Sequence, residues 1–422
     1  MNLTEFEKSL KNGTGNAITF LMNNKASDEH IEAIFNISTK CYVYDKQCEG
    51  GRGHYLWNAI NFSGARDILQ RRILEIMNDR EEYDLEQCFE LAGIFYSKGN
   101  KSALEFMHKN LRYSEGWSSY IGSDEIITAE GSKGIQFVFK NIAERFLFDE
   151  NFDGDYFLCL ELKEKYGLDK LLDILSPFML GNPRFKDYLI NDHKFESTGR
   201  LKYEVSYDVV KDNLNKYNKH FMFVWGKEAS DKDILKAAYD LLVATEENVV
   251  LRLLSVFRRR KFPLKYTPIL KWLDSDNDEV VSSAIELLKE FQSQDIYRIA
   301  MSNIQVKENW YEYLPLLTYN YNDKDSELIY RQICSVSDED IMHSIIMNFG
   351  YIIDNCNVNN FKLLNHMYLD GRCSLCRTKI VEVMIKNFSL NEDKLLEFKY
   401  DSNEIIRRMV EDGCRADADS FA

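Results

Sequence analysis

Apolar residues at helical spacing recur along the second half of the chain, and this periodicity limits the possible folds more than any other feature. In residues 273–292, LDSDNDEVVSSAIELLKEFQ, an apolar stripe follows the helical period of about 3.6 residues. Its positions are Val280, Ala284, Leu287, Leu288 and Phe291. Asp276 stands three residues before Glu279, the spacing of a capping box, and we expect the helix to start there. The small Ala284 would let a neighbouring helix approach closely.

The same pattern occurs again before and after this segment. Ile234 begins a stripe 46 residues before Val280, with Ser230 and Asp233 in the capping positions. A later copy with Asp401 and Glu404 at the cap begins its stripe at Ile405, near three units of about 42 residues further on. The other apolar positions are Ala238, Leu241 and Leu242 in the early copy, Ile406 and Met409 in the late copy, and Cys376, Ile380, Val383 and Met384 in an intermediate one. The copy around residues 326–336 fits poorly.

These residues resemble the HEAT-like family of α-solenoids, in which the second helix of a repeat often begins after an acidic turn and carries a small residue on its buried face. The resemblance covers residues 230–413 and extends loosely to the N-terminal half. The chain departs from the family pattern at Val281 and Ser282, where an Arg or Lys is frequent. The resemblance implies an all-α fold of antiparallel helix pairs stacked as a solenoid, and a tendency to bind partners. It implies no particular function.

The N-terminal half also has helical patterns, which predict helices over residues 65–79, 83–99, 101–111 and 133–148. The pattern loosens around residues 176–229. We therefore predict an irregular helical region over 1–175, a connecting helical region over 176–229 and HEAT-like repeats over 230–422. The prolines are expected to lie between helices, because an interior proline costs about 3 kcal/mol. They are Pro177, Pro183, Pro263, Pro268 and Pro315.

Composition restricts the environment and the partners of the chain. No apolar run approaches the roughly 20 residues that cross a bilayer, so we expect a soluble, cytoplasmic protein without membrane partners. Nine scattered cysteines are typical of a reducing compartment. A net charge of −15 argues against general binding to a phosphate backbone, which depends on lysine and arginine, but leaves room for a local basic patch.

An acidic segment, DENFDGDYFLCLE, has the alternating oxygen ligands of a calcium-binding loop. Asp149, Asn151 and Asp153 match its first ligand positions, and Asp155 continues the series. The closing carboxylate is missing, because Leu160 occupies its position. The favoured interpretation is an acidic connector between two helices, with a calcium site as the alternative.

Two further segments contain residue types that bind ligands in other proteins. The glycines of EGGRGH, beside Arg52, could bring backbone amides to an anion, although a solvent-exposed loop is the favoured interpretation. Cys373 and Cys376 have the spacing of one half of a zinc site. Because only one such pair exists, we interpret them as core cysteines.

A basic cluster follows a predicted helix and is the strongest candidate for contact with a partner. It consists of Arg252, Arg258, Arg259, Arg260 and Lys261. The cluster either meets an acidic partner or a nucleic-acid phosphate, or is a solvated helix end stabilised by the helix dipole. The tryptophans Trp225, Trp272 and Trp310 are interpreted as packing residues.

From these features we expect a non-catalytic binding or scaffold protein that presents a helical-repeat surface to a protein or peptide. The alternative is a nucleic-acid-binding helical-repeat protein, or an enzyme acting on DNA, that uses the basic cluster. The chain lacks the short motifs of zinc proteases and serine hydrolases, so an enzyme is the less favoured prediction, and no cofactor is expected.

Overall fold

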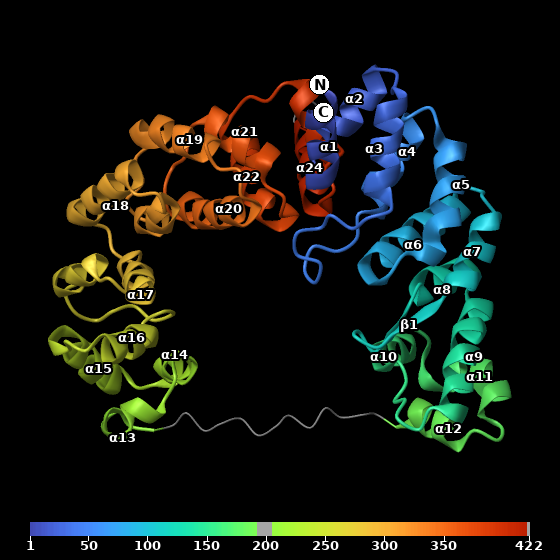
Figure 1. The fold of residues 1–422 in the computed structure, drawn as a ribbon, viewed down its shortest axis with the longest axis horizontal. Helices are drawn as coiled ribbons and strands as arrows, with labels where there is room; N and C mark the ends of the chain where they lie inside the picture. Colours follow the sequence, from blue (N-terminus) through green and yellow to red (C-terminus); the bar gives the residue numbers. More distant parts are fainter. Residues whose placement is uncertain (192–204, 420–422) are drawn as a thin grey trace. The chain divides into compact units, whose positions relative to one another are not determined.

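The computed structural model describes residues 1–191 and 205–419, and for residues 412–419 it describes the backbone alone. The described chain is helical apart from one short hairpin (Figure 1). The hairpin pairs β1 (Arg112–Ser114) with β2 (Ser119–Ile121) in antiparallel register, with Tyr113 opposite Tyr120. The predicted all-α class is therefore confirmed. None of the described helices combines the length and the apolar character that crossing a bilayer requires.

The chain forms two compact units that interleave in sequence. The first unit contains the described residues of Met1–Glu196, Arg372–Leu375 and Leu390–Ala422. The second unit contains the described residues of Ser197–Gly371 and Cys376–Ser389. Residues 192–204, which fall in the predicted connecting region, lie outside the described residues.

Short helices make up the first unit. They are α1 (Leu3–Asn12), α2 (Asn16–Asn23), α3 (Asp28–Ser38), α4 (Gly53–Phe62), α5 (Arg66–Ile76), η1 (Met77–Asp79), α6 (Glu82–Ser97), α7 (Ser102–Asn110), α8 (Ser123–Glu130), α9 (Ser132–Phe148), α10 (Tyr156–Tyr166), α11 (Leu168–Met179), α12 (Pro183–Ile190), α23 (Glu392–Lys399) and α24 (Glu404–Asp419). Many of them contact the next helix and the next but one, as α4 contacts α5 and α6. Their buried faces form one core that extends from Phe6 to Leu189.

The last part of the chain packs onto the first helices within this unit. The Ser402 amide donates to the Gly13 carbonyl at 2.8 Å, and the rings of Phe62 and Tyr400 meet edge to face at 6.0 Å. Gly15 precedes α2 so close to α23 that a Cβ there would lie 1.8 Å from the Glu397 carbonyl oxygen. Only glycine fits at this contact.

The second unit is also built from short helices. They are α13 (Tyr207–Asp212), η2 (Leu214–Lys216), α14 (Lys219–Glu228), α15 (Asp231–Val243), α16 (Glu247–Val256), η3 (Thr267–Asp274), α17 (Asp278–Leu288), α18 (Gln294–Val306), η4 (Trp310–Leu317), η5 (Asp323–Asp325), α19 (Ser326–Cys334), α20 (Glu339–Asn355), α21 (Phe361–Asp370) and, from Cys376 onward, α22 (Ser374–Asn387). Here α16 contacts α14, α15 and α17, and η4 contacts α17, α18 and α20.

The clearest predicted stripe is confirmed, but its helix cap is displaced by one residue. Val280, Ala284 and Leu288 are fully buried. The helix begins at Asp278, and its N-cap is Asn277 instead of Asp276. The amide side chain of Asn277 accepts from the Glu279 amide at 3.1 Å, which satisfies a free donor of the first turn.

The other copies agree in part with the prediction. Ser230 caps α15 as predicted and accepts from the Asp233 amide at 3.2 Å. In the last copy the cap is Asn403 in place of Asp401, because the Asn403 side chain accepts from the Ile405 amide at 2.8 Å. Consequently Ile405 is 51% exposed and only the next residue, Ile406, is fully buried. In α22, Ile380 and Met384 are buried as predicted, but Cys376 is only half-buried.

The prediction that every proline lies between helices is wrong for four of the five. Pro177 and Pro315 lie inside α11 and η4, and Pro183 and Pro268 lie in the first turns of α12 and η3. In α11 the proline falls in the last turn, so it removes only one hydrogen bond. The carbonyl that its missing amide would have used belongs to Asp173, and the Ser176 hydroxyl donates to that carbonyl at 3.0 Å.

Candidate functional site

The predicted basic cluster lies in the second unit, at the end of α16 and in the turn that follows it. Arg252 belongs to the helix itself and donates to the Asn215 side chain at 3.2 Å. The helix ends at Val256, and the Phe257 amide closes its last turn on the Leu254 carbonyl. Four consecutive cationic residues, Arg258 to Lys261, therefore follow the helix, where its dipole favours positive charge.

One member of the cluster is used inside the protein. The Arg260 guanidinium donates to the carbonyls of Gly226 and Ala229 at 3.2 and 2.5 Å, and pairs with Asp231 at 2.5 Å. These contacts satisfy carbonyls at the C-terminal end of α14 and hold the connection to α15. Arg260 is therefore a structural residue. Its guanidinium already contacts groups of the second unit, which differs from its predicted role as a partner contact.

Arg258, Arg259 and Lys261 are exposed, and within the described residues none of the three has an acidic partner. The two guanidinium groups lie 5.8 and 5.6 Å from the ring of Phe223, within the range of a cation–π contact. Because no carboxylate neutralises them, their charges are available to a ligand.

These residues line a pocket of about 710 Å³, which we call the basic pocket. Its wall also includes Phe223 and Phe257, Glu286, Lys289 and Glu290, and Thr318, Tyr319, Tyr351 and Asn355. Five cationic side chains face two carboxylates in this wall, although the whole chain carries a net charge of −15. Lys289 pairs with Glu286 at 2.7 Å and lies 5.0 Å from the Tyr351 ring centre. The pocket thus combines positive charge with aromatic surface.

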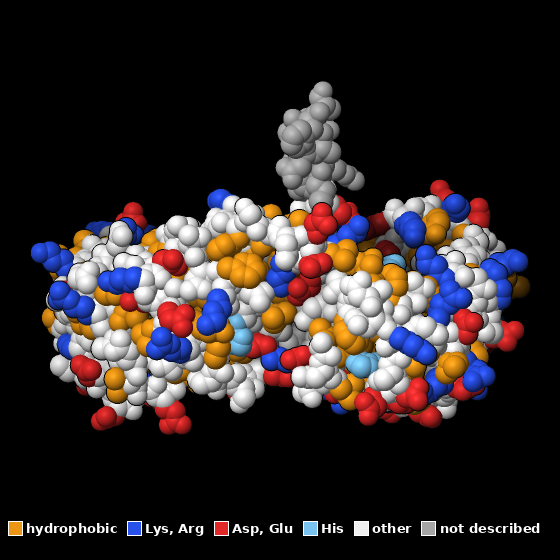
Figure 2. Space-filling model, turned by 90° about the horizontal axis from the view of Figure 1, so that it is seen from above, with side chains coloured by type: hydrophobic (Ala, Val, Ile, Leu, Met, Phe, Trp, Pro, Cys, Tyr) orange, Lys and Arg blue, Asp and Glu red, His pale blue; other side chains and the backbone are white. Residues whose placement is uncertain are grey.

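The positive charge of the basic pocket is local. On the face shown in Figure 2, basic and acidic side chains are intermixed with apolar ones and do not separate into large areas of one sign. A ligand that carries negative charge is therefore attracted to a pocket rather than to a whole surface.

Sequence analysis missed the aromatic half of this pocket. Tyr351 lies on α20 outside the buried stripe of that helix and is 46% exposed, and Phe223 is half-buried on α14. An aromatic residue outside an apolar stripe is a usable signal, because helices bury only one face. That signal does not reveal that both residues border the same cavity.

The acidic loop, residues 149–155 of the first unit, satisfies its polar groups internally. Asp149 accepts from Arg145 at 3.0 Å, and Asp155 caps α10 while also accepting from the Tyr120 amide at 2.9 Å. Among the described residues, the predicted ligands Asp149, Asp153 and Asp155 do not come within joint reach of one ion, and Asn151 is exposed.

The cation of this loop is an arginine. The Arg184 guanidinium donates to four main-chain carbonyls at 2.9–3.0 Å, and these belong to Phe146, Asp149, Glu150 and Phe152. A calcium site in such a segment would need main-chain carbonyls as ligands, and three carbonyls of this loop already accept from Arg184. These contacts fit the favoured interpretation of an acidic connector between two helices.

The glycine loop binds an anion that the protein itself supplies. The Gly53 amide donates to the Glu90 carboxylate at 2.7 Å, and a Cβ on Gly51 would lie 1.5 Å from that carboxylate. Arg52 is 5% exposed and donates to the carbonyls of Lys11 and Arg372. The prediction of a solvent-exposed loop is therefore wrong for Arg52 and Gly53, both of which are buried.

Glu90 borders a cavity of about 550 Å³ in the first unit, together with Glu125, Asp124 and His54. Burial raises the pKa of Glu90 to about 7 and that of Glu125 to about 8. The Gly53 amide opposes the shift of the Glu90 pKa, but desolvation is the larger cause. Both groups therefore take up protons at a higher pH than an exposed glutamate, so the cavity carries less negative charge near neutral pH than its composition suggests.

The two cysteines of the predicted pair differ in burial. Cys376 is half-buried, with its Sγ 3.4 Å from His343 Nε2. Cys373, Cys88 and Cys159 are buried, and the other described cysteines are partly or fully exposed. Trp225 and Trp310 are buried as predicted, whereas Trp272 is half-buried.

Comparisons with known proteins do not assign a function to these sites. No family model matches the chain, no curated protein is similar to it, and no solved structure matches its fold. The assignment of function therefore depends on the chemistry of the pockets.

Proposed function

We propose that the protein is a non-catalytic binding protein of the HEAT-like α-solenoid type, which holds an acidic segment of a protein partner in the basic pocket. The observation that carries this proposal is the convergence of Arg258 and Arg259, which have no acidic partner among the described residues, with Phe223 and Tyr351 around one cavity. Arginine forms paired, charge-assisted hydrogen bonds with carboxylates and phosphorylated side chains. Aromatic walls add contact area at low cost in side-chain entropy.

The solenoid part of the proposal draws support from the order of helix contacts. In the first unit, α4 contacts α5 and α6, α5 contacts α6 and α7, and α6 contacts α7 and α8. Stacked helix pairs give such contacts, because each helix packs on its own partner and on the next pair. Stacked repeats commonly bind extended segments of other proteins.

Nucleic acid is the alternative ligand for the same residues, because arginines and aromatic rings also bind phosphates and bases. Two features favour a peptide. Glu286 and Glu290 lie in the wall of the basic pocket and would repel a continuous phosphate backbone. The net charge of −15 opposes the approach of a polyanion, whereas a short acidic segment experiences mainly the local field.

Both ligands can be tested on the full chain. A bead library of random peptides, with and without phosphorylated residues, would be incubated with the labelled protein beside beads that carry single-stranded or duplex DNA. We expect retained peptides to be rich in Asp, Glu or phosphorylated residues. The variant Arg258→Ala/Arg259→Ala should lose this preference.

A matched control removes two charges elsewhere in the second unit. Arg298 and Arg331 are exposed on α18 and α19 and each pairs with an acidic residue of its own helix. Arg298→Ala/Arg331→Ala should retain the same peptides as the unaltered protein. Retention of DNA alone, lost in Arg258→Ala/Arg259→Ala, would establish the alternative, and a library without acidic preference would overturn the proposal.

A further inference from the structure

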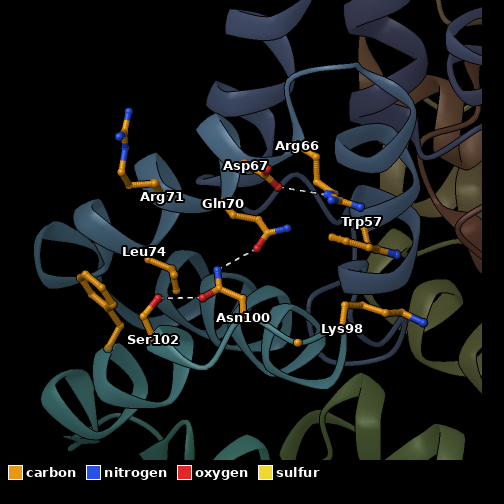
Figure 3. Close-up of a pocket in the computed structure, with 11 residues that line it drawn as sticks. Trp57, Arg66, Asp67, Gln70, Arg71, Leu74, Lys98, Asn100 and Ser102 are labelled. Carbon is orange, nitrogen blue, oxygen red and sulfur yellow. Dashed lines mark hydrogen bonds and ion pairs between the residues drawn. The ribbon is translucent and has the colours of Figure 1, made fainter.

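A separate cavity of about 460 Å³ lies in the first unit among α4, α5, the turn between α6 and α7, and α7 (Figure 3). We call it the Gln70 cavity. Its lining includes Trp57, Arg66, Gln70, Lys98, Asn100 and Phe106. Its volume falls within the range of about 300–1,000 Å³ of small-molecule sites, and its polar groups come from three different segments of the chain.

Gln70 directs an unused hydrogen-bond donor into this cavity. Its side chain is 7% exposed, and its Oε1 accepts from Asn100 Nδ2 at 2.8 Å. Ser102 donates in turn to Asn100 Oδ1 at 2.7 Å, which fixes the orientation of the Asn100 amide. Among the described residues, no acceptor meets Gln70 Nε2. Figure 3 shows this nitrogen pointing toward Trp57 and Arg66.

A donor in this position favours a ligand that offers an acceptor. The Gln70 amide nitrogen is accessible from the cavity, so an acceptor on a ligand can replace solvent there and form a direct hydrogen bond with it. Because the bonds through Asn100 and Ser102 hold the Gln70 amide in place, the donor is already oriented before a ligand binds. Such preorganisation increases affinity.

The charge of the Gln70 cavity favours an anion. Arg66, Arg71 and Lys98 line it with one carboxylate, Asp67, which pairs with Arg66 at 3.1 Å. Figure 3 shows the Arg66 side chain directed toward Trp57, whereas the Arg71 side chain points away from Gln70. Figure 3 also shows the Lys98 side chain extending away from Gln70, so Arg66 is the cation available for direct contact, and Lys98 and Arg71 contribute charge from the rim.

The apolar part of the lining favours a planar group. Trp57 is half-buried, and its ring packs against Phe95 with centres 5.9 Å apart and planes inclined by 55°. That contact limits the motion of the indole while the cavity still reaches it. Phe106 and Leu74 supply further apolar surface. A flat ring of a ligand can stack on such surface.

We propose that the Gln70 cavity binds a small ligand of the nucleotide class, in which a planar base is joined to a phosphate group. The base stacks on Trp57 and accepts a hydrogen bond from Gln70 Nε2. The phosphate group lies toward Arg66, with Lys98 contributing charge from the rim. This site is independent of the basic pocket, which belongs to the other unit.

Isothermal titration of the full chain with AMP, GMP, CMP and UMP tests the proposal, with adenosine and inorganic phosphate as partial ligands. We expect at least one mononucleotide to bind, with adenosine and phosphate each weaker by about tenfold or more because each makes only part of the contacts. Absence of binding by all four mononucleotides would overturn the proposal. Phosphate binding as tightly as a mononucleotide would also overturn it.

Variants locate the binding. Gln70→Glu keeps an oxygen to accept from Asn100 but adds negative charge, and should weaken mononucleotide binding by about tenfold or more. Lys98→Ala should weaken it less, and Lys109→Ala, which removes an exposed charge on α7 outside the lining, should leave it unchanged. Trp57→Phe keeps a ring and should bind better than Trp57→Ala. Unchanged affinity in both Gln70→Glu and Lys98→Ala would place the ligand elsewhere and overturn the assignment.

Discussion

The acidic loop of the first unit and the basic pocket of the second both begin as conspicuous runs of charge in the sequence, yet the protein uses them in different ways. In the acidic loop, Asp149 and Asp155 accept internal hydrogen bonds, and Arg184 donates to four carbonyls. In the basic pocket, Arg258 and Arg259 have no acidic partner within the described residues. The difference teaches that the partners within reach, rather than the number of charges, decide whether a charged cluster is structural or open to a ligand.

The largest effect expected from this comparison is on stability. Arg184→Ala leaves four main-chain carbonyls without their donor, three of them in the acidic loop, and we expect the free energy of unfolding to fall by about 2–4 kcal/mol. Urea denaturation followed by circular dichroism measures this change. Arg184→Lys should recover only part of the loss, because an ammonium group cannot reach the same set of acceptors. A loss below about 0.5 kcal/mol in Arg184→Ala would show that the loop does not depend on this contact.

A second comparison sharpens the distinction inside the basic cluster itself. Arg260→Ala removes the contacts to Gly226, Ala229 and Asp231, and should destabilise the protein by about 1–2 kcal/mol. Arg259→Ala removes an exposed side chain and should change stability by less than about 0.5 kcal/mol. Thermal melts of the two variants under one condition give both values. Equal destabilisation would remove the distinction between structural and available arginines.

The buried carboxyl groups of Glu90 and Glu125 predict a dependence of stability on pH. The pKa values of Glu90 and Glu125 are raised to about 7 and about 8, above the 4.5 of an unperturbed glutamate. At a pH between the unperturbed pKa and the raised pKa, the folded state binds protons that the unfolded state has released. Stability therefore declines as the pH rises from about 5 to 8. Glu90→Gln and Glu125→Gln should each flatten this decline by on the order of 1 kcal/mol.

Chemical denaturation at several pH values measures that slope. Glu105→Gln on α7, an exposed glutamate, is a suitable control and should leave the slope unchanged. If the slope were the same in all three variants and the unaltered protein, the carboxyl groups of this cavity would not titrate as their burial implies.

The smallest expected effect is that of calcium. Because Arg145 and Arg184 already meet the polar groups of the acidic loop, calcium in large excess should leave the melting temperature unchanged. Differential scanning fluorimetry with calcium and with magnesium as the ionic control makes the comparison. A rise with calcium alone would mean that the loop rearranges into a metal site, and it would weaken the contrast between the two charged regions.

The helical class and much of the buried pattern could be predicted from local periodicity. Val280, Ala284 and Leu288 are buried because a helix that packs on one face must bury that face. The exact caps were less predictable, since Asn277 and Asn403, close in sequence to the predicted Asp276 and Asp401, can also accept from the free amides of a first turn.

Long-range packing could not be predicted in this way. Helical spacing describes each helix but not its neighbours, so it does not indicate that the described residues after Leu390 pack with the first helices through Ser402 and Gly13. For the same reason the cationic half of the basic pocket was visible in the sequence and its aromatic half was not. Phe223 and Tyr351 lie far apart in sequence, and only the folding of the second unit brings them to one cavity.

The most direct test of the account is the affinity of one retained acidic peptide, measured by fluorescence anisotropy at several salt concentrations for the unaltered protein, Arg258→Ala/Arg259→Ala and Arg298→Ala/Arg331→Ala. The account predicts that the first double variant loses about tenfold or more in affinity and shows a shallower salt dependence, while the second behaves as the unaltered protein. Equal affinity in all three proteins would contradict it, because the unpaired arginines of the basic pocket would then take no part in binding.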